Sequence, residues 1–456
     1  MIFSSLLFLF WFIPVFFTVY YICPGRFRNA VLFIGSIIFY AWGEPEFLVL
    51  IFISIFVNYI MGLLMYRAKA DAIRRLCLII ALTYDFLMLF IFKYADFFIE
   101  NINRLTGAGL HKVNITLPLG ISFYTFQIAS YVIDLYRGRI KAEKSPLILG
   151  TYLVMFPQLI AGPIVVYSQI SDKLHERKLS YEDVEEGIRL FILGLGSKVL
   201  IANNVGALFD DAKAMGFSGI SMPLAWMSML SFSLQIYFDF NGYSLMAMGL
   251  GKMLGFDIPA NFDYPYISRS ITEFWRRWHI TLSSWFRNYL YIPLGGSRKG
   301  KKRTYVNLLI VWLLTGFWHG AGWNFVLWGL FFFVVLVTEK AGFNAFLERH
   351  PGFGRFYSLI LIGLSWMIFA ITDIREMGIF FTRLLCFKFD NTALYYLKNY
   401  LIILLVSCIL ATPALSGFWN KNKRNILGTI ISIVILVLST AYLTDAAYNP
   451  FLYFRF

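Results

Sequence analysis

The sequence predicts an all-α integral membrane protein with about twelve transmembrane helices. Hydrophobic residues make up 59% of the 456 residues and charged residues only 14%. Apolar runs of roughly 20 residues recur along almost the whole chain, and each can cross a hydrocarbon core about 30 Å thick. Short clusters of Lys and Arg separate these runs, as in proteins whose loop charges set their membrane orientation. We therefore expect one multispanning domain over residues 1–456.

The spans follow one another with short connections. Segment 1–22 has no basic residue before its apolar run and no small-residue cleavage site after it, so it predicts a retained anchor. The expected spans lie near 3–22, 29–43, 47–66, 76–98, 117–136, 188–209, 223–241, 305–318, 322–340, 356–373, 399–416 and 426–443.

The basic loops give the orientation. The positive-inside rule places loops 24–28, 67–75, 137–144, 173–178, 297–303 and 420–424 in the cytoplasm. This arrangement requires the apolar stretch 146–165 to be re-entrant, and it puts both termini outside. Segment 271–291 is expected at the interface or within the protein, because an arginine at mid-membrane costs about 2.5–3.5 kcal/mol.

Charge and cysteine usage exclude several function classes. The formal net charge of +14 comes from short loops, so acidic lipid headgroups are the expected partner and nucleic acid is not. The four cysteines are far apart with no histidine at ligand spacing, so neither a disulfide framework nor a metal site is expected. The sequence also lacks the GxSxG, Walker and HExxH motifs.

His319 is the strongest candidate for chemistry. It lies between two apolar runs, in a segment with Trp318, Asn324 and several glycines, roughly 22 Å into the bilayer if residues from Thr304 are helical. A neutral histidine there can accept a proton from an attacking hydroxyl. The glycines are expected to let a substrate approach the ring and the backbone bend. The alternative is a histidine that only bonds neighbouring helices.

A second group surrounds His279. In a continuous helix Trp275, His279 and Ser283 would share one face, and Glu273 could pair with Arg277. Together with Arg276, these side chains could cradle the phosphates and stack the adenine of a nucleotide-bearing acyl donor. An interfacial anchor of aromatic rings and snorkelling arginines explains the same pattern.

Asp239 falls within an apolar run and is followed by Asn241 and Gly242. A carboxylate in such a run is either functional or paired with a cation. Pairing is the commoner explanation, and it also applies to Asp85 and to Asp134, which could pair with Arg137.

Several segments resemble the membrane-bound O-acyltransferase family, in the branch that acetylates alginate and cell-wall polysaccharides. They are residues 156–163, 235–251, 261–266, 273–296 and 315–329, in the family's order and spacing. The C-terminal residues 449–454 also resemble this branch. The resemblance covers essentially the whole chain.

This resemblance implies a single O-acyltransferase domain of many helices round a central funnel, in a bacterial plasma membrane. It implies that His319 is catalytic and that His279 is the second signature histidine. No permanently bound cofactor is implied. The donor would be acetyl-CoA or an acyl carrier protein thioester, and the acceptor a polysaccharide, reached through a secreted or membrane-anchored esterase-like partner.

The expected mechanism has His319 as general base for an acceptor hydroxyl. His279 with Arg276 and Arg277 would position the donor or steady developing negative charge. One alternative keeps the chemistry but transfers D-alanyl from a carrier protein to teichoic acid. Another is a lipid or polysaccharide transporter, which moves its substrate without exchanging bonds.

Overall fold

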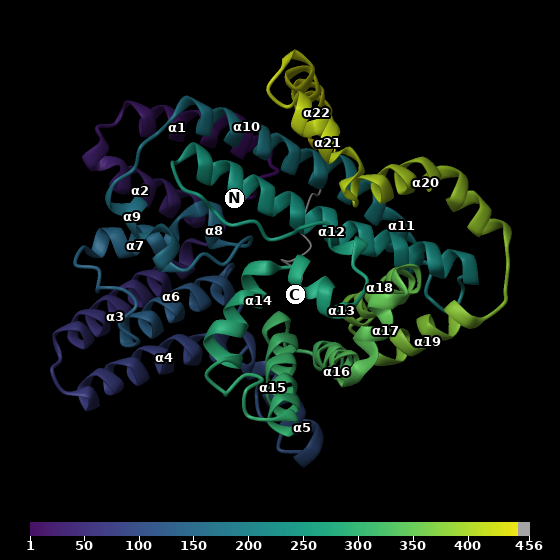
Figure 1. Cartoon of the computed structure of the whole chain (residues 1–456), viewed down its shortest axis with the longest axis horizontal. Coiled ribbons are helices and arrows are strands. Elements are labelled where there is room, and N and C mark those ends of the chain that lie inside the picture. Colours follow the sequence, from purple (N-terminus) through teal and green to yellow (C-terminus); the bar gives the residue numbers. More distant parts are fainter. Residues whose placement is uncertain (446–456) are drawn as a thin grey trace. The chain divides into compact units, whose positions relative to one another are not determined.

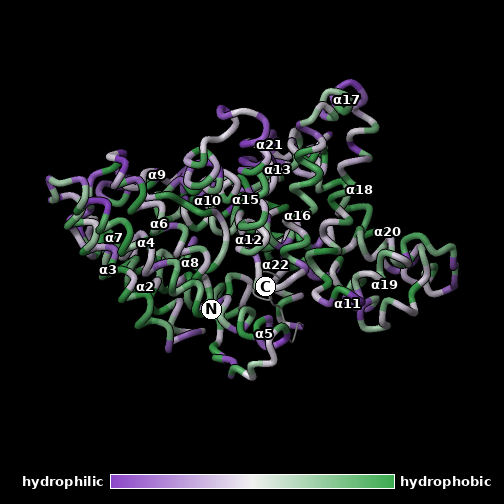
Figure 2. Tube along the Cα trace, turned by 90° about the horizontal axis from the view of Figure 1, so that it is seen from below, coloured by the Kyte–Doolittle hydropathy of each residue, from purple (hydrophilic) through white to green (hydrophobic). Residues whose placement is uncertain are grey.

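The computed structural model describes residues 1–445, and every regular element in that range is helical. This confirms the all-α prediction. The C-terminal residues 449–454 lie outside the described part. Figure 1 shows the helices coloured along the chain from the N-terminus to the C-terminus. Figure 2 shows that most of the trace is hydrophobic, with hydrophilic stretches near α9 (Tyr167–His175), α17 (Asn344–Arg349) and α21 (Ser416–Asn422).

Seven helices within the described residues combine the length and hydropathy of membrane spans. Other predicted spans coincide with helices that are shorter, such as α2 (Arg28–Ala41), or longer and more polar, such as α12 (Met222–Met253). The total of twelve spans therefore stays a prediction. The seven are Pro45–Arg67, Asp71–Lys93, Tyr181–Ala214, Trp323–Arg349, Pro351–Ala370, Asn391–Leu410 and Ile426–Asp445.

The chain divides into two compact units. The first contains Met1–Phe191 and Met246–Pro259, and the second contains Ile192–Leu245 and the described residues from 260 onward, so α12 contributes residues to both. The remaining helices of the first unit are η1 (Phe8–Phe12), α1 (Ile13–Ile22), η2 (Gly25–Phe27), η3 (Pro45–Phe47), α3 (Leu48–Arg67), α4 (Asp71–Lys93), α5 (Ala95–Thr106), α6 (Ile121–Tyr136), α7 (Pro146–Val154) and α8 (Phe156–Leu159), with α10 (Tyr181–Gly196) reaching its boundary.

Helices α3, α4 and α6 pack side by side in the first unit (Figure 1). Two buried aspartates of these helices have hydrogen-bonding or ion-pair partners nearby. Asn58 Nδ2 donates to Asp85 Oδ1 at 2.8 Å, and Asp134 forms an ion pair with Arg139 at 3.3 Å. Asp134 is therefore paired with a cation, as expected, whereas the partner of Asp85 is the neutral Asn58 amide.

The stretch expected to be re-entrant consists of short, buried elements. Helix α7 has nine residues, which rise about 14 Å and cannot cross the hydrocarbon core. After α8 the chain continues without regular structure to Val166, and residues 149–165 are all buried. These lengths agree with a segment that enters and leaves on one side.

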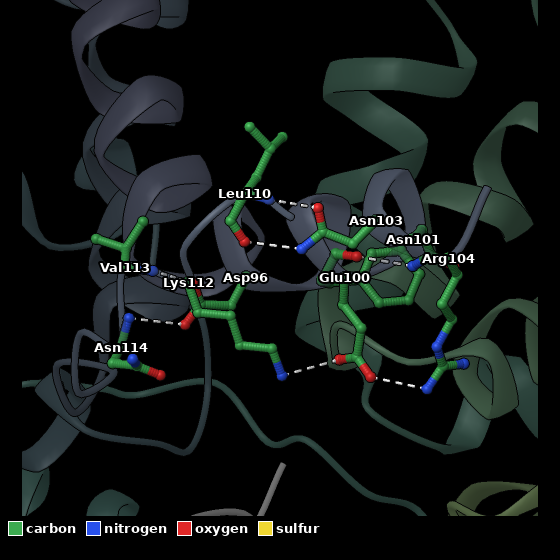
Figure 3. Close-up of polar contacts among 10 residues, drawn as sticks. Asp96, Glu100, Asn101, Asn103, Arg104, Leu110, Lys112, Val113 and Asn114 are labelled. Carbon is green, nitrogen blue, oxygen red and sulfur yellow. Dashed lines mark hydrogen bonds and ion pairs between the residues drawn. The ribbon is translucent and has the colours of Figure 1, made fainter. Parts of the chain in front are cut away.

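Helix α5 and the segment after it form a closed hairpin held by polar contacts (Figure 3). Asp96 accepts the backbone N–H groups of Val113 and Asn114 at 2.7 and 3.0 Å. Glu100 pairs with Arg104 and Lys112 at 2.7 and 3.3 Å. The contacts fix a connection that has no regular structure of its own between residues 107 and 118.

The second unit carries the residues singled out for chemistry. Its helices, besides α12 and α17, are η4 (Ser197–Ala202), α11 (Asn203–Ala214), η5 (Pro265–Ile267), α13 (Ile271–Arg277), α14 (Ile280–Phe286), η6 (Arg287–Tyr291), α15 (Lys301–His319), α16 (Trp323–Thr338), η7 (Glu339–Phe343), α18 (Pro351–Ala370), α19 (Ile374–Leu385), α20 (Asn391–Leu410), η8 (Pro413–Leu415), α21 and α22 (Ile426–Asp445). Helices α15 and α16 are close neighbours, joined by the turn at residues 320–322 (Figure 1).

Candidate active site

His319 is the last residue of α15, and only 6% of its surface is exposed. Three aromatic rings meet the imidazole close to edge-on: Trp318, Trp328 and Phe369, with centroid distances of 4.9, 5.0 and 5.4 Å. The next residue, Gly320, is extended, so the helix ends at His319. The bend expected here is confirmed.

The glycines around His319 serve helix packing, and the expectation that they also let a substrate approach the ring stays a prediction. A side chain at Gly316 would meet the backbone carbonyl of Phe325, and one at Gly320 would meet the Phe325 ring. A side chain at Gly329 would meet the carbonyl of Trp312. The missing side chains let α15 and α16 approach closely, and this approach fixes the end of α15.

Asn324 stabilises the site through a hydrogen bond to the neighbouring helix. Its side chain is buried, and Nδ2 donates to the carbonyl oxygen of Phe369 at 3.1 Å. This bond ties the start of α16 to the end of α18. Because the Phe369 ring packs on His319, Asn324 contributes to the site by holding one of the aromatic rings around the imidazole.

His279 lies in a break between two short helices. Its backbone is left-handed, with φ +44° and ψ +54°, a region that residues with a Cβ rarely occupy. The predicted continuous helix through Trp275, His279 and Ser283 is wrong, because α13 ends at Arg277 and Trp278 is extended. Such strain persists only where surrounding contacts enforce it.

Asn261 supplies those contacts. Its carbonyl accepts the Ile280 N–H at 3.0 Å. Its side-chain oxygen accepts the Thr281 N–H at 3.2 Å and the Thr281 hydroxyl at 2.9 Å, and lies 3.2 Å from His279 Nδ1. Asn261 belongs to one of the family segments, yet its spacing gave no reason to assign it a role, because the contact spans 18 residues.

Trp318 brings the two histidines into one neighbourhood. Its ring centroid lies 6.1 Å from that of His279 and 4.9 Å from that of His319. Phe240 packs against the other side of His279, at 4.7 Å and 84°. Burial lowers the pKa of His279 to about 3, so its imidazole is neutral at physiological pH.

Trp275 belongs to an aromatic cluster beside the site. Its ring lies 4.7 Å from Trp312, 5.7 Å from Trp328 and 5.0 Å from Phe332. Trp328 also packs on His319, so Trp275 reaches that histidine through one intervening ring. Its contacts with these three rings are packing contacts.

The two arginines of α13 differ. Arg277 is held by Asp263 at 2.9 Å and Glu273 at 3.0 Å, which confirms the expected pair with Glu273. Arg276 is exposed, and like Arg269 it forms no ion pair within residues 1–445. A cavity of about 590 Å³ is lined by Asp263, Arg269, Ser270, Thr272, Glu273, Arg276, Arg277, Asn344, Leu347 and Glu348.

Glu339 anchors the wall of this cavity to the neighbouring helix. The buried carboxylate accepts the backbone N–H groups of Ile271 and Thr272 at 2.7 and 2.8 Å and the Thr272 hydroxyl at 2.6 Å. A carboxylate at a helix N-terminus satisfies donors that have no partner within the helix. The sequence analysis missed Glu339, whose signal is an acidic residue at the end of an apolar run.

Asp239 is paired. Its carboxylate lies 2.6 Å from the Lys198 ammonium, and the two side chains are 3% and 5% exposed. Pairing with a cation therefore accounts for the burial of the Asp239 carboxylate. The next residue, Phe240, is the ring that packs on His279, so the pair fixes a part of α12 that borders the site.

Comparison with known proteins assigns the class. The family model described as the membrane-bound O-acyltransferase family matches residues 143–382, which include Asn261, His279 and His319. The chain belongs to the membrane-bound O-acyltransferase family. It is an O-acyltransferase and a multi-pass bacterial membrane protein.

Relatives place it within that class. The chain is 35% identical to the probable alginate O-acetylase of Pseudomonas putida, over 100% of both chains. It is 31% identical to the peptidoglycan O-acetyltransferase of Helicobacter pylori, over 100% of this chain and 98% of that one. A teichoic acid D-alanyltransferase of Streptococcus thermophilus is 30% identical over 55% of this chain and 68% of its own.

Proposed function

We propose that this protein transfers an acetyl group from a cytoplasmic thioester to hydroxyl groups of an extracellular polysaccharide. The observation that carries the proposal is the pair of buried histidines that both pack against Trp318 in a membrane-bound O-acyltransferase. The full-length relatives named as alginate and peptidoglycan acetylating enzymes support acetyl as the group and polysaccharide as the acceptor.

His319 is the general base in this mechanism. The acceptor hydroxyl gives its proton to His319 while its oxygen attacks the thioester carbonyl. The tetrahedral intermediate collapses, the C–S bond breaks, and the proton passes from His319 to the leaving thiolate. The products are an acetyl ester and a free thiol.

The donor enters beside α13. Arg276 and Arg269 are cations without an ion-pair partner in the described residues, and both line the 590 Å³ cavity. Phosphate groups of acetyl-CoA, or of a carrier protein's prosthetic arm, suit such guanidinium groups. The cavity residues 344–348 follow α16, whose end shares the cytoplasmic side of loop 297–303 in the predicted orientation.

In this proposal the hydroxyl that attacks the thioester at His319 belongs to an esterase-like partner outside the membrane. A sugar hydroxyl then attacks the partner's acetyl ester, which forms the polysaccharide ester and frees the partner's hydroxyl. Supporting it is the need for a second active site where the acceptor is too large to enter a buried one. D-alanyl transfer is the second candidate because of the teichoic acid relative, but that likeness covers 55% of the chain, against 100% for the two O-acetylating relatives.

Inside-out membrane vesicles test the donor and the direction. Radiolabelled acetyl-CoA or radiolabelled D-alanyl carrier protein is added outside the vesicles, with the partner and polysaccharide enclosed. We expect acetyl label to appear on enclosed polysaccharide. Label on the polysaccharide from the D-alanyl carrier protein and not from acetyl-CoA would show that acetyl is not the transferred group. Polysaccharide that becomes labelled only after detergent opens the vesicles would contradict transfer across the membrane.

A further inference from the structure

An apolar groove lies between the segment 7–19 and helix α2, which are neighbours in the first unit (Figure 1). The groove has a volume of about 480 Å³, and every residue that lines it is apolar or glycine. Its most open part consists of Trp11, Val15 and Val19 on one side and Ile34, Ile38 and Trp42 on the other, each between 51% and 69% exposed. Such a surface in a membrane protein faces hydrocarbon chains.

The length of the groove fits one acyl chain. Its lining residues on α2 run from Val31 to Trp42, a rise of about 16 Å at helical spacing. One leaflet of a hydrocarbon core about 30 Å thick has a depth of about 15 Å. A single lipid tail can therefore lie along the groove over its whole length.

Arg28 stands at one end of this groove. It precedes Val31, Gly35 and Ile38 at intervals of three or four residues, so all four lie on one face of α2. In the part of the chain that the structure describes, Arg28 forms no ion pair, and its enclosed Nε has no hydrogen-bond partner. The predicted orientation places this end of α2 at the cytoplasmic surface.

A second guanidinium group, that of Arg177, lies close to the first. The Cζ atoms of Arg28 and Arg177 are 5.9 and 6.0 Å from the centre of the same Tyr20 ring. Arg177 Nη2 donates to Asn29 Oδ1, which ties this side chain to the start of α2. Burial lowers the pKa of Arg177, and the positive charge of Arg28 contributes in the same direction.

No carboxylate within residues 1–445 forms an ion pair with either arginine. By contrast, Lys173 and Lys252 in the same unit both pair with Asp257. Arg177 Nη1 is also enclosed and lacks a hydrogen-bond partner among the described residues. Guanidinium groups bind phosphate oxygens through paired hydrogen bonds, so two neighbouring arginines without a carboxylate suit a phosphate group.

We propose that the groove, Arg28 and Arg177 form a binding site for an anionic phospholipid, with one acyl chain between α1 and α2 and the phosphate on the two guanidinium groups. Charge complementarity selects this occupant, because two uncompensated cations favour a headgroup with a net negative charge over a zwitterionic one. The groove adds a requirement for an acyl chain. The site uses none of the residues assigned to acyl transfer.

Native mass spectrometry of the delipidated full-length protein in detergent tests the ligand. The probes are dioleoylphosphatidylglycerol, dioleoylphosphatidylcholine, dioleoylglycerol and coenzyme A. We expect phosphatidylglycerol to bind at least about 10-fold more tightly than phosphatidylcholine or dioleoylglycerol. Equal binding of dioleoylglycerol would overturn the role of the phosphate, and displacement of phosphatidylglycerol by excess coenzyme A would assign the site to a soluble phosphate compound instead.

A double variant, Arg28→Gln with Arg177→Gln, tests the two arginines. Its affinity for phosphatidylglycerol should fall at least about 10-fold. The matched control is Arg67→Gln with Arg75→Gln, which also removes two positive charges, from exposed arginines that have no ion pair in residues 1–445. The control should keep the wild-type affinity, whereas equal losses in the two double variants would reduce the effect to general attraction of anionic lipid.

Ile34→Trp tests the groove with both arginines in place. Ile34 is 58% exposed, so a larger side chain can be accommodated there while it narrows the path of the acyl chain. We expect weaker binding of phosphatidylglycerol at an unchanged thermal midpoint. Wild-type affinity in this variant would overturn the placement of the chain between α1 and α2.

Discussion

Lys198 and Asp239 form the most buried ion pair of the described chain. A paired charge in such surroundings is stable only while its partner remains, because the pair's attraction offsets the loss of hydration. Asp239→Asn should therefore lower the free energy of unfolding by about 3–5 kcal/mol, measured as a lower thermal midpoint in detergent.

An exposed carboxylate provides the control for this prediction. Asp263 pairs with Arg277, but its side chain is 62% exposed. Asp263→Asn should cost no more than about 1 kcal/mol. Equal losses in the two variants would show that burial of the Lys198–Asp239 pair is not what makes it important.

Arg276 and Arg277 are adjacent and should respond differently to replacement. Arg276→Ala removes an unpaired cation from the cavity, so the donor KM should rise about 10-fold while the thermal midpoint is unchanged. Arg277→Ala removes two ion pairs and should lower the midpoint. Steady-state kinetics with acetyl-CoA measure the KM of the Arg276→Ala variant. An unchanged KM would show that Arg276 does not bind the donor.

At the scale of helices, the contact between α15 and α16 determines where His319 lies. Gly316 faces the Phe325 carbonyl, which belongs to backbone and cannot rotate away. Gly316→Ala should therefore destabilise the protein by about 1–3 kcal/mol and reduce transfer, because the two helices must separate. Thermal unfolding and acetyl transfer in the same preparation measure both effects.

Gly378 in α19 is the comparison, because a side chain there would meet nothing within 4 Å. Gly378→Ala should be neutral or stabilising by up to about 1 kcal/mol, since alanine favours helix. A loss of stability in both variants would point to a general intolerance of helical glycines to replacement and not to the α15–α16 contact.

These helices also show what the sequence could predict. The apolar runs located α15 and α16 to within a few residues, because hydropathy and basic flanks act locally. The break at His279 was not predictable from spacing, because it is enforced by Asn261, and the helix pattern of residues 275–283 contained no glycine or proline to indicate it. The role of Gly316 and Gly320 was missed for the same reason: a neighbouring helix occupies their space.

At the scale of the whole molecule, composition and loop charge predicted the class of fold, and the all-helical structure with seven candidate spans confirms its main feature. The total number of spans and the funnel remain predictions, since several helices are too short or too polar to be recognised as spans by length and hydropathy. Of the candidate site, the sequence supplied both histidines and Trp318, whereas Asn261, Glu339 and Lys198 emerged only from contacts across the fold.

The central claim is that His319 carries the acyl transfer. The most direct measurement is transfer of radiolabelled acetyl from acetyl-CoA in membranes that contain the wild-type protein or His319→Ala, with the esterase-like partner co-expressed and the amounts of folded protein matched. The account predicts label on the partner or the polysaccharide only with the wild-type protein. Equal label with His319→Ala would contradict it.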